Sequence, residues 1–291
     1  FHMYLLVALS PLTGGLNFNT LKLGAVLESL AGIVAFYGFG HALIGDRSQR
    51  ARNFGLLVAL MGSVGLWHLI VTRVSLRIML TPLVTTLLMW ALIRLIRHNR
   101  RQDALWAGLI IGFGFYSYQS LRIVPLLAVI ATGIGIVWCA QNRNDRMLYL
   151  KNFMIIAVVA FAMYLPVLRY WITDPQMYWS RVASTVVGTD FNCAEDSIEC
   201  VSLENPAQIF AQNMAKTLLM FTFRGDGNWA YNAPTYAALD PIAGGFFVCG
   251  IGAWMVWSIK RRDAIGIFMV AALVIMLIPS AATLARSNEV P

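Results

Sequence analysis

The chain has 291 residues, of which 12% are charged and 58% are hydrophobic, and its formal net charge is +8. Soluble domains carry about 25% charged residues, and a soluble globule of this size has too much surface to cover with so few charges. The composition therefore excludes an ordinary cytosolic enzyme, a disordered chain and a nucleic-acid-binding protein. In a membrane protein, a basic balance more often reflects Lys and Arg on the cytoplasmic face than an acidic partner.

Eight apolar stretches are candidates for membrane-spanning helices, each of which needs about 20 mostly apolar residues. In chain order they are Leu21–Gly45, Phe54–Ile70, Ile78–Ile96, Ala104–Tyr116, Ile123–Ala140, Phe153–Tyr170, Pro241–Ile259 and Ala264–Ala282. The fourth is short. The opening stretch 1–12 is too short to span, so we expect an interfacial or re-entrant helix there. The sequence predicts an all-α, polytopic membrane protein with about eight spans.

The basic residues sort the connecting segments into two sides. The segments Asp46–Asn53, Arg94–Asp103, Gln141–Lys151 and Lys260–Asp263 hold three, four, three and three Lys or Arg, which is 13 of the 22. Alternation of the spans puts all four segments on one side, and the positive-inside rule makes that side cytoplasmic. We expect an integral protein of the cell's inner membrane, with both chain ends and the loop 171–240 on the outer face.

The chain divides into three predicted parts. Residues 1–170 are a membrane domain that holds the short helix 1–12 and six spans. Residues 171–240 are an outer-face loop with an acidic patch and, at Gln208–Phe221, a stretch with the periodicity of an amphipathic helix. Residues 241–291 hold the last two spans and an outer tail.

The cysteines and other metal-binding residue types point to no cofactor. Four cysteines are too few for a disulfide framework, and their spacing does not match a zinc site. Cys193 and Cys200 lie in the outer loop, where they could pair or remain free thiols, and the sequence leaves both open. No metal-ligand cluster is visible, although a carboxylate upstream of the chain could bind a divalent metal.

Arg73 and Arg77 lie on the outer side despite the bias that keeps basic residues inside. Their spacing of four residues puts them on one helical face, where two like charges repel modestly unless an anion lies between them. Arginine suits phosphate because its planar fork binds two oxygens at once. The alternative is that both side chains reach the outer lipid headgroups, as long basic side chains at helix ends do.

Arg122 is a third outer arginine, and it follows Tyr118 and Gln119 at the outer end of a helical hairpin. Two nearby tyrosines, Tyr116 and Tyr118, are typical of the aromatic belt at a membrane interface. A tyrosine, a glutamine and an arginine at a membrane mouth also suit a sugar and a phosphate. The sequence leaves both interpretations open.

The string from Phe221 to Pro234 is dense in Gly, Asn and Asp, which are turn-forming residues. It combines Arg224 with Asp226, Asn228 and Asn232 and with two large aromatics. Stacking faces together with amides and a carboxylate are what a carbohydrate site needs. This string is the second candidate site.

Glu28 and His41 lie inside the first predicted span, and an ionisable residue within a membrane is a functional candidate by default. Both are near the ends of that span, so each could instead reach water. The sequence leaves their roles open.

Together these pieces resemble the bacterial membrane glycosyltransferases related to dolichyl-phosphate-mannose–protein mannosyltransferases, which are glycosyltransferase family 39 and have the GT-C fold. The order and membrane side of the pieces agree with that family over most of the chain. The matching pieces are Trp67-His68…Arg73…Arg77…Pro82, Gly112-Phe-Gly114-Phe-Tyr116-Ser-Tyr118…Arg122…Pro125, Met220-Phe…Phe223-Arg224-Gly225-Asp226…Asn228…Asn232…Pro234…Leu239-Asp240-Pro241…Gly244, and Ile278-Pro279-Ser280…Glu289-Val290-Pro291.

The resemblance implies transfer of a sugar from a polyprenyl-phosphate carrier to a protein, lipid or glycan acceptor, with inversion at the anomeric carbon. Arginines would stabilise the departing lipid phosphate, where negative charge develops. We therefore expect Arg73, Arg77, Arg122 and Arg224 to bind the donor phosphate, and Tyr118, Gln119, Asp226, Asn228 and Asn232 to bind the sugar or the acceptor.

The resemblance also implies which part is missing. The family's first span and first outer loop, which carries the acidic catalytic base, would lie upstream of Phe1, and the chain would be truncated at Pro291 as well. We expect no catalytic base within these 291 residues, and we expect them to be inactive on their own.

Two other classes of function stay open. A transporter would need polar groups at mid-membrane, broken helices and internal repeats. No repeat is visible, and the polar residues gather at the outer ends instead. A non-catalytic membrane assembly subunit would use the outer loop 171–240 as a docking surface.

Overall fold

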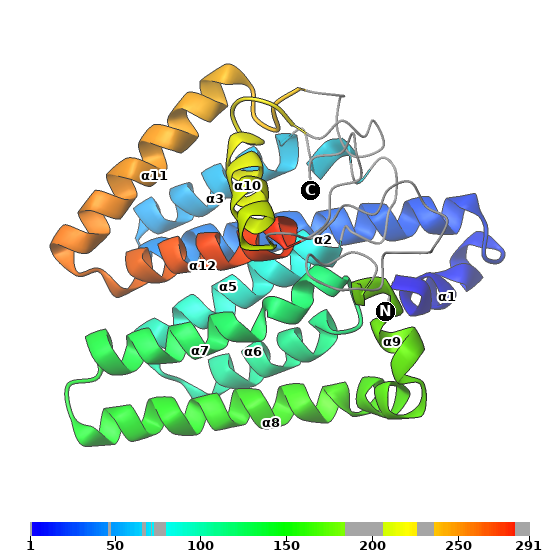
Figure 1. The fold of residues 1–291 in the computed structure, drawn as a ribbon, viewed down its shortest axis with the longest axis horizontal. Coiled ribbons are helices and arrows are strands. Elements are labelled where there is room, and N and C mark those ends of the chain that lie inside the picture. The colour runs from blue at the N-terminus through cyan, green and yellow to red at the C-terminus, as the bar shows by residue number, and fades with distance from the viewer. Residues whose placement is uncertain are drawn as a thin grey trace. The chain divides into compact units, whose positions relative to one another are not determined.

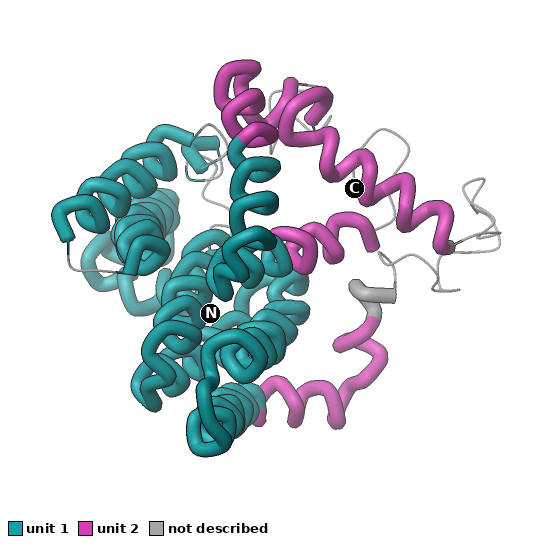
Figure 2. Tube along the Cα trace, turned by 90° about the vertical axis from the view of Figure 1, so that its left-hand side faces the viewer, with its two compact units in different colours: residues 1–164, 250–272 teal, residues 165–249, 273–291 magenta. Residues whose placement is uncertain are grey.

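The computed structural model describes residues 2–45, 48–65, 68–70, 72, 80–183, 206–225 and 236–282. Within these ranges the chain is helical and contains no β-strand, which confirms the all-α fold class. The chain divides into two compact units, which Figure 2 shows in different colours. Unit 1 comprises residues 1–164 and 250–272, and unit 2 comprises residues 165–249 and 273–291.

Six described helical segments are long and apolar enough to cross a bilayer, which indicates a membrane-embedded protein. They are α2 (Phe18–Ile44), α5 (Leu80–His98), the continuous segment Gln119–Cys139, α8 (Arg143–Thr173), α11 (Pro241–Arg261) and α12 (Ala264–Ala281). The segment Gln119–Cys139 consists of the 3-10 turn η2 (Gln119–Ile123), α7 (Pro125–Ile134) and the π-helical turn η3 (Gly135–Cys139).

Two of the eight predicted spans correspond to shorter helices, α3 (Gln49–Val64) and α6 (Arg101–Gly114). The bounds of α3 differ from the predicted Phe54–Ile70 at both ends. The helix begins earlier because the Ser48 hydroxyl accepts a hydrogen bond from the Ala51 backbone N–H at 3.2 Å, which caps it. It ends at Val64, directly before Gly65.

The first helix, α1 (His2–Thr13), lies where the sequence predicts a short interfacial or re-entrant helix. A capping box then starts α2. The Asn17 side chain accepts from the Thr20 backbone N–H at 3.0 Å, and the Thr20 hydroxyl accepts from the Asn17 backbone N–H at 3.2 Å. The same helix ends at Gly45, whose φ of 82° is the left-handed conformation that glycine adopts without strain.

Within unit 1, helices α5, α6, α7 and the first part of α8 run side by side in alternating directions (Figure 1). Two glycines of α6 allow it to approach α8 closely. A Cβ at Gly108 would lie 2.9 Å from the Cβ of Val159 and 3.0 Å from the carbonyl oxygen of Ile156, and one at Gly112 would meet Met163. Small residues four positions apart are the usual means of close helix packing in membranes.

Three of the basic connecting segments lie together at one end of unit 1. The Arg97 guanidinium donates to the carbonyl oxygen of Leu43 at 2.6 Å, which joins the end of α5 to the end of α2. Asn99 follows α5 in a left-handed conformation, with φ 48°, and its side chain accepts from the Asn152 amide at 2.7 Å and donates to the carbonyl oxygen of Asp145 at 3.4 Å. These bonds join the turn between α5 and α6 to the start of α8.

The fourth basic segment, Lys260–Asp263, lies at the same end. Its Arg262 lines a hollow together with Trp138, which lies in η3 just before the turn into α8. All four segments that the sequence assigns to one side therefore share one end of unit 1, here called the basic end.

Unit 2 contains α9 (Pro175–Ala183) and α10 (Pro206–Leu219), and α10 lies where the sequence predicts the helical stretch Gln208–Phe221. Two buried polar residues fix α10 to the end of α12. The Asn213 amide donates to the carbonyl oxygen of Ala281 at 3.3 Å, and the Thr217 and Ser280 hydroxyls share a hydrogen bond of 3.1 Å.

Candidate functional site

Four of the nine predicted site residues are described. Tyr118, Gln119 and Arg122 belong to unit 1, whereas Arg224 belongs to unit 2. The other five lie outside the described residues, and so do Cys193 and Cys200. These five are Arg73, Arg77, Asp226, Asn228 and Asn232.

Tyr118, Gln119 and Arg122 lie on one short turn between α6 and α7. The chain leaves α6 at Gly114 and enters η2, where the backbone N–H of Leu121 donates to the carbonyl oxygen of Tyr118 at 3.0 Å. The Leu121 side chain is buried and anchors the turn. Residues three apart in a 3-10 helix lie in line, so Gln119 and Arg122 share one face of the turn. All three predicted residues are half-buried there.

The segment before this turn is fixed to α8 by two contacts. The Tyr116 hydroxyl donates to the carbonyl oxygen of Met163 at 2.7 Å. The rings of Phe115 and Tyr164 lie 4.9 Å apart between centroids, inclined by 57°. An aromatic pair of this kind together with a hydrogen bond holds the position of the turn relative to α8.

Buried hydroxyl groups lie on the elements that meet at this turn. The side-chain oxygens of Thr81 and Thr85 in α5, and of Ser117 after α6, are buried and have no hydrogen-bond partner. The last residue of α6 lies against both Val84 and Leu121, so the start of α5, the end of α6 and η2 adjoin one another. A buried hydroxyl without a hydrogen-bond partner lowers the stability of the folded protein. Three of them on elements that adjoin η2 indicate a place for a polar ligand or for water.

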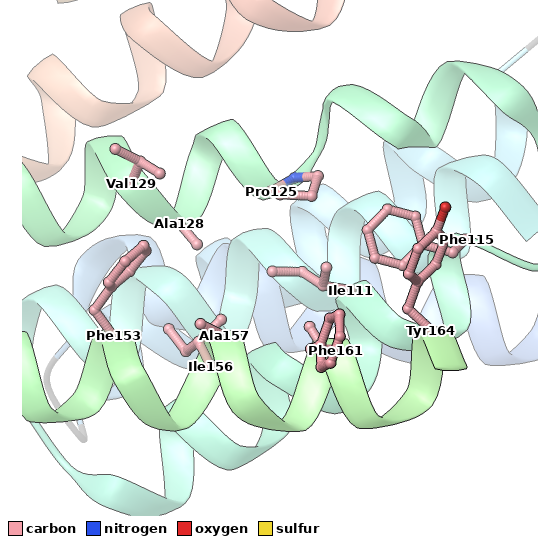
Figure 3. Close-up of a pocket in the computed structure, with 11 residues that line it drawn as sticks. Ile111, Phe115, Pro125, Ala128, Val129, Phe153, Ile156, Ala157, Phe161 and Tyr164 are labelled. Atoms are coloured by element: carbon pink, nitrogen blue, oxygen red, sulfur yellow. The ribbon is translucent and has the colours of Figure 1, made fainter. Parts of the chain in front are cut away.

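An apolar cavity of about 220 Å³ lies between α6, α7 and α8 (Figure 3). Phe115 and Tyr164 lie at one end of it, near Pro125, and Phe153 lies at the other end. Only Val124 separates Pro125 from the end of η2, so that end of the cavity adjoins the turn that carries Arg122. The cavity is lined by Ile111, Phe115, Pro125, Ala128, Val129, Phe153, Ile156, Ala157, Ala160, Phe161 and Tyr164.

The turn of Arg122 and this cavity together form the candidate site. The turn supplies a guanidinium, an amide and a phenol, and the cavity supplies hydrocarbon surface. Such an arrangement suits an amphiphile whose anionic or polar head lies at the turn and whose chain lies along α8. Because α6 runs from the basic end to Gly114, the site lies at the opposite end of unit 1, here called the Arg122 end.

A second polar group lies within α2 and the segment after α3. His68 is 8% exposed, and its Nε2 lies 2.9 Å from the Ser29 hydroxyl oxygen, while its Nδ1 is buried without a hydrogen-bond partner. Glu28 is 4% exposed and precedes Ser29 on α2. The sequence indicated Glu28 as an ionisable residue within a span but gave no role to His68. A histidine inside an apolar stretch was the signal that could have found it.

Arg224 is exposed in unit 2, in the string that the sequence marks as the second candidate site. Described residues on either side of that string are paired, because the backbone N–H groups of Ala238 and Leu239 donate to the carbonyl oxygens of Met220 and Phe221 at 3.0 and 3.1 Å. Met220 and Phe221 therefore lie beside Ala238 and Leu239. Arg224 and Arg122 belong to different units, so each stands as a separate candidate.

Among the described residues, no group of three or more His, Cys, Asp or Glu side chains could hold a metal ion. Comparisons with protein-family models, curated proteins and solved structures found no match to this chain. The resemblance to the lipid-phosphate-sugar glycosyltransferases therefore stays a prediction from the quoted motifs.

Proposed function

We propose that this protein is an inverting glycosyltransferase of the GT-C type, which takes a sugar from a polyprenyl-phosphate donor at the outer face of the bacterial inner membrane. The observation that supports the proposal most is the pairing of the Arg122 turn with the apolar cavity along α8. A lipid phosphate has the two parts that this arrangement fits, an anionic head and a hydrocarbon chain.

The positions of the basic residues support the proposed orientation. The four basic connecting segments share the end of unit 1 opposite to Arg122. If that end faces the cytoplasm, as the positive-inside rule expects, Arg122 lies at the outer face. Its charge then lies on the side where the positive-inside rule does not call for one, which favours a role in binding an anionic ligand.

The proposed reaction is a displacement at the anomeric carbon of the donor sugar. The acceptor hydroxyl oxygen forms the new bond to that carbon, and the bond from the carbon to the phosphate oxygen breaks. The hydroxyl proton passes to an acidic residue, which the resemblance places in the family's first outer loop. The lipid phosphate leaves with its electron pair, and the Arg122 guanidinium stabilises the negative charge that develops on it.

In this proposal, different residues of the chain bind the phosphate, the sugar and the isoprene chain of the donor. Arg122 binds the phosphate oxygens through its planar fork. Gln119, on the same face of the turn, and Tyr118 donate hydrogen bonds to sugar hydroxyls. The apolar residues of α7 and α8 hold the first isoprene units of the carrier. Arg73, Arg77 and Arg224 are proposed as further phosphate contacts, and Asp226, Asn228 and Asn232 as contacts to the sugar or the acceptor.

The test is transfer of a labelled sugar from a polyprenyl-phosphate donor, in membranes of cells that express the complete gene. We expect Arg122→Ala to lower the rate about 100-fold or more, the usual effect of removing one group that stabilises a developing anion. The matched control is Arg101→Ala at the basic end, which should leave the rate unchanged. Wild-type rates in Arg122→Ala, or in both Arg73→Ala and Arg224→Ala, would show that the site is assigned wrongly.

One observation favours a different class, a proton-coupled transporter. Buried Glu28 and His68 lie on or beside α2, and ionisable groups inside a membrane often form proton relays. The two functions are distinguished by solute flux in proteoliposomes. Flux that depends on a proton gradient, and that Glu28→Gln abolishes, would favour the transporter. Sugar transfer without such flux would favour the glycosyltransferase.

A further inference from the structure

A hollow of about 640 Å³ opens at the basic end, on the other side of unit 1 from the Arg122 site. It lies between η3 and the turn that joins α11 to α12, and it is lined by Val137, Trp138, Ile259, Arg262 and Ile267. Two of its aliphatic side chains are widely exposed, Val137 at 68% and Ile259 at 65%. Such exposure of apolar surface beside a hollow indicates that something apolar lies against it.

The net charge of the turn at this hollow is positive, since Lys260, Arg261 and Arg262 outnumber Asp263. Arg262 is exposed, and its guanidinium forms no ion pair with another described residue. The neighbouring carboxylate has a different role. One oxygen of Asp263 accepts from the backbone N–H of Gly266 at 3.0 Å, which caps the start of α12. With Lys260 and Arg261 also in this turn, the rim of the hollow attracts an anion.

Tryptophans place the hollow at the level of a membrane interface. Trp106, Trp138 and Trp257 all lie within about two turns of the basic end of their helices, and they are 63%, 45% and 46% exposed. The Arg261 guanidinium carbon lies 5.4 Å from the centre of the Trp257 ring. Tryptophan is enriched where hydrocarbon meets lipid headgroups, and arginine beside it reaches the phosphate level.

We propose that this hollow is a binding site for one anionic phospholipid from the leaflet at the basic end. The lipid phosphate lies on the Arg262 guanidinium, and an acyl chain lies against Val137, Ile259 and Ile267. The Trp138 ring lies between them, at the level of the ester groups. The bound lipid joins the turn between α11 and α12 to η3. The proposal depends on the membrane location of the protein and is independent of the glycosyltransferase proposal.

A lipid explains the whole lining better than a soluble anion does. Inorganic phosphate would use Arg262 alone and leave the three aliphatic side chains exposed. An apolar helix of a partner protein would cover the aliphatic side chains but would leave the charge of Arg262 without a counter-ion. An anionic phospholipid satisfies both parts, since its phosphate supplies the charge and its chain supplies the apolar surface.

The test uses the purified protein in nanodiscs of phosphatidylcholine with a minor fraction of phosphatidylglycerol, transferred to detergent for native mass spectrometry of retained lipid. Arg262→Gln removes the charge. Because glutamine, like arginine, is not a glycine, the strain of the left-handed backbone at this position, with φ 51°, stays the same. We expect it to weaken retention of one phosphatidylglycerol about five-fold, the size of one basic side chain acting on an anionic lipid surface. Arg262→Lys should keep most of the retention.

The matched control is Arg101→Gln, which removes an exposed charge at the same end but outside the hollow. Ile267→Trp fills the hollow without changing charge, and we expect it also to release the lipid. If the wild-type protein retained phosphatidylcholine and phosphatidylglycerol equally well, the proposal would be overturned. An equal loss in Arg262→Gln and Arg101→Gln would also overturn it, since the attraction would then be general. Displacement of the lipid by inorganic phosphate would indicate a site for soluble anions instead.

Discussion

The basic end and the Arg122 end of unit 1 differ in what their polar side chains contact, although the basic end also has buried polar atoms without a partner, such as Asn152 Oδ1 and Asp103 Oδ2. At the basic end, arginines and amides bond to the protein itself, with Arg97 on a carbonyl of α2 and Arg94 on Asp103 at 2.7 Å. At the Arg122 end, the hydroxyls of Thr85 and Ser117 are buried without partners, and the turn that carries Arg122 adjoins an apolar cavity. Bonded polar groups hold helices in place, whereas unbonded ones next to a cavity indicate room for a ligand.

The largest effect on stability is expected at the basic end, from Asn152→Leu. This side chain is fully buried, and its amide donates to both the carbonyl oxygen and the side-chain oxygen of Asn99, at 3.0 and 2.7 Å. The substitution leaves both oxygens without that donor, which we expect to cost about 3 kcal/mol. Thermal unfolding in detergent, followed by fluorescence, measures it. A midpoint equal to that of the wild type would mean that this network does not hold the basic end together.

A smaller loss is expected where α6 meets α8. Gly108→Ala places a methyl group 2.9 Å from the Cβ of Val159 and 3.0 Å from the carbonyl oxygen of Ile156, so we expect a cost of about 2 kcal/mol. Gly133→Ala is the matched control. Its methyl group would meet nothing within 4 Å, and alanine favours a helix by up to about 1 kcal/mol over glycine. In the same unfolding measurement, Gly108→Ala should therefore lower the midpoint and Gly133→Ala should raise it. A change of the same sign in both variants would contradict the close packing of α6 on α8.

The smallest change is expected at the Arg122 end. Thr85→Val keeps the shape of the side chain and removes a buried hydroxyl that has no partner. We expect the free protein to keep its stability or to gain up to about 1 kcal/mol. Binding of a polyprenyl phosphate, measured by the shift of the unfolding midpoint, should weaken. A clear loss of stability without ligand would mean that this hydroxyl serves the fold.

Much of the fold could be predicted from the sequence, because the thickness of the bilayer sets the length of each apolar stretch and the positive-inside rule places the basic segments on one side. The stretches chosen as spans correspond to helices throughout the described residues, and their basic connectors do share one end. The early end of α3 at Val64 was missed because the apolar run continues past Gly65 to Ile70. Hydropathy records the apolar run but not the point where the helix stops.

The candidate site could be predicted only in part. Arg122 stood out because it lies at the outer end of a hairpin against the topological bias. Thr81, Thr85 and Ser117 were missed, since single hydroxyls within apolar stretches are common and form no pattern. The cavity was missed for a similar reason. Its small residues belong to helices that are distant in sequence, and only packing brings α6, α7 and α8 together.

The most direct measurement compares two arginines, one from each end, in two assays. Arg122→Gln and Arg97→Gln are each examined for sugar transfer from a polyprenyl-phosphate donor and for unfolding midpoint. We expect Arg122→Gln to lose about 100-fold in rate with little change in stability. We expect Arg97→Gln, which loses the 2.6 Å bond to Leu43, to lower the midpoint and keep the rate per folded molecule. Equal rates in the two variants would contradict a ligand role for Arg122.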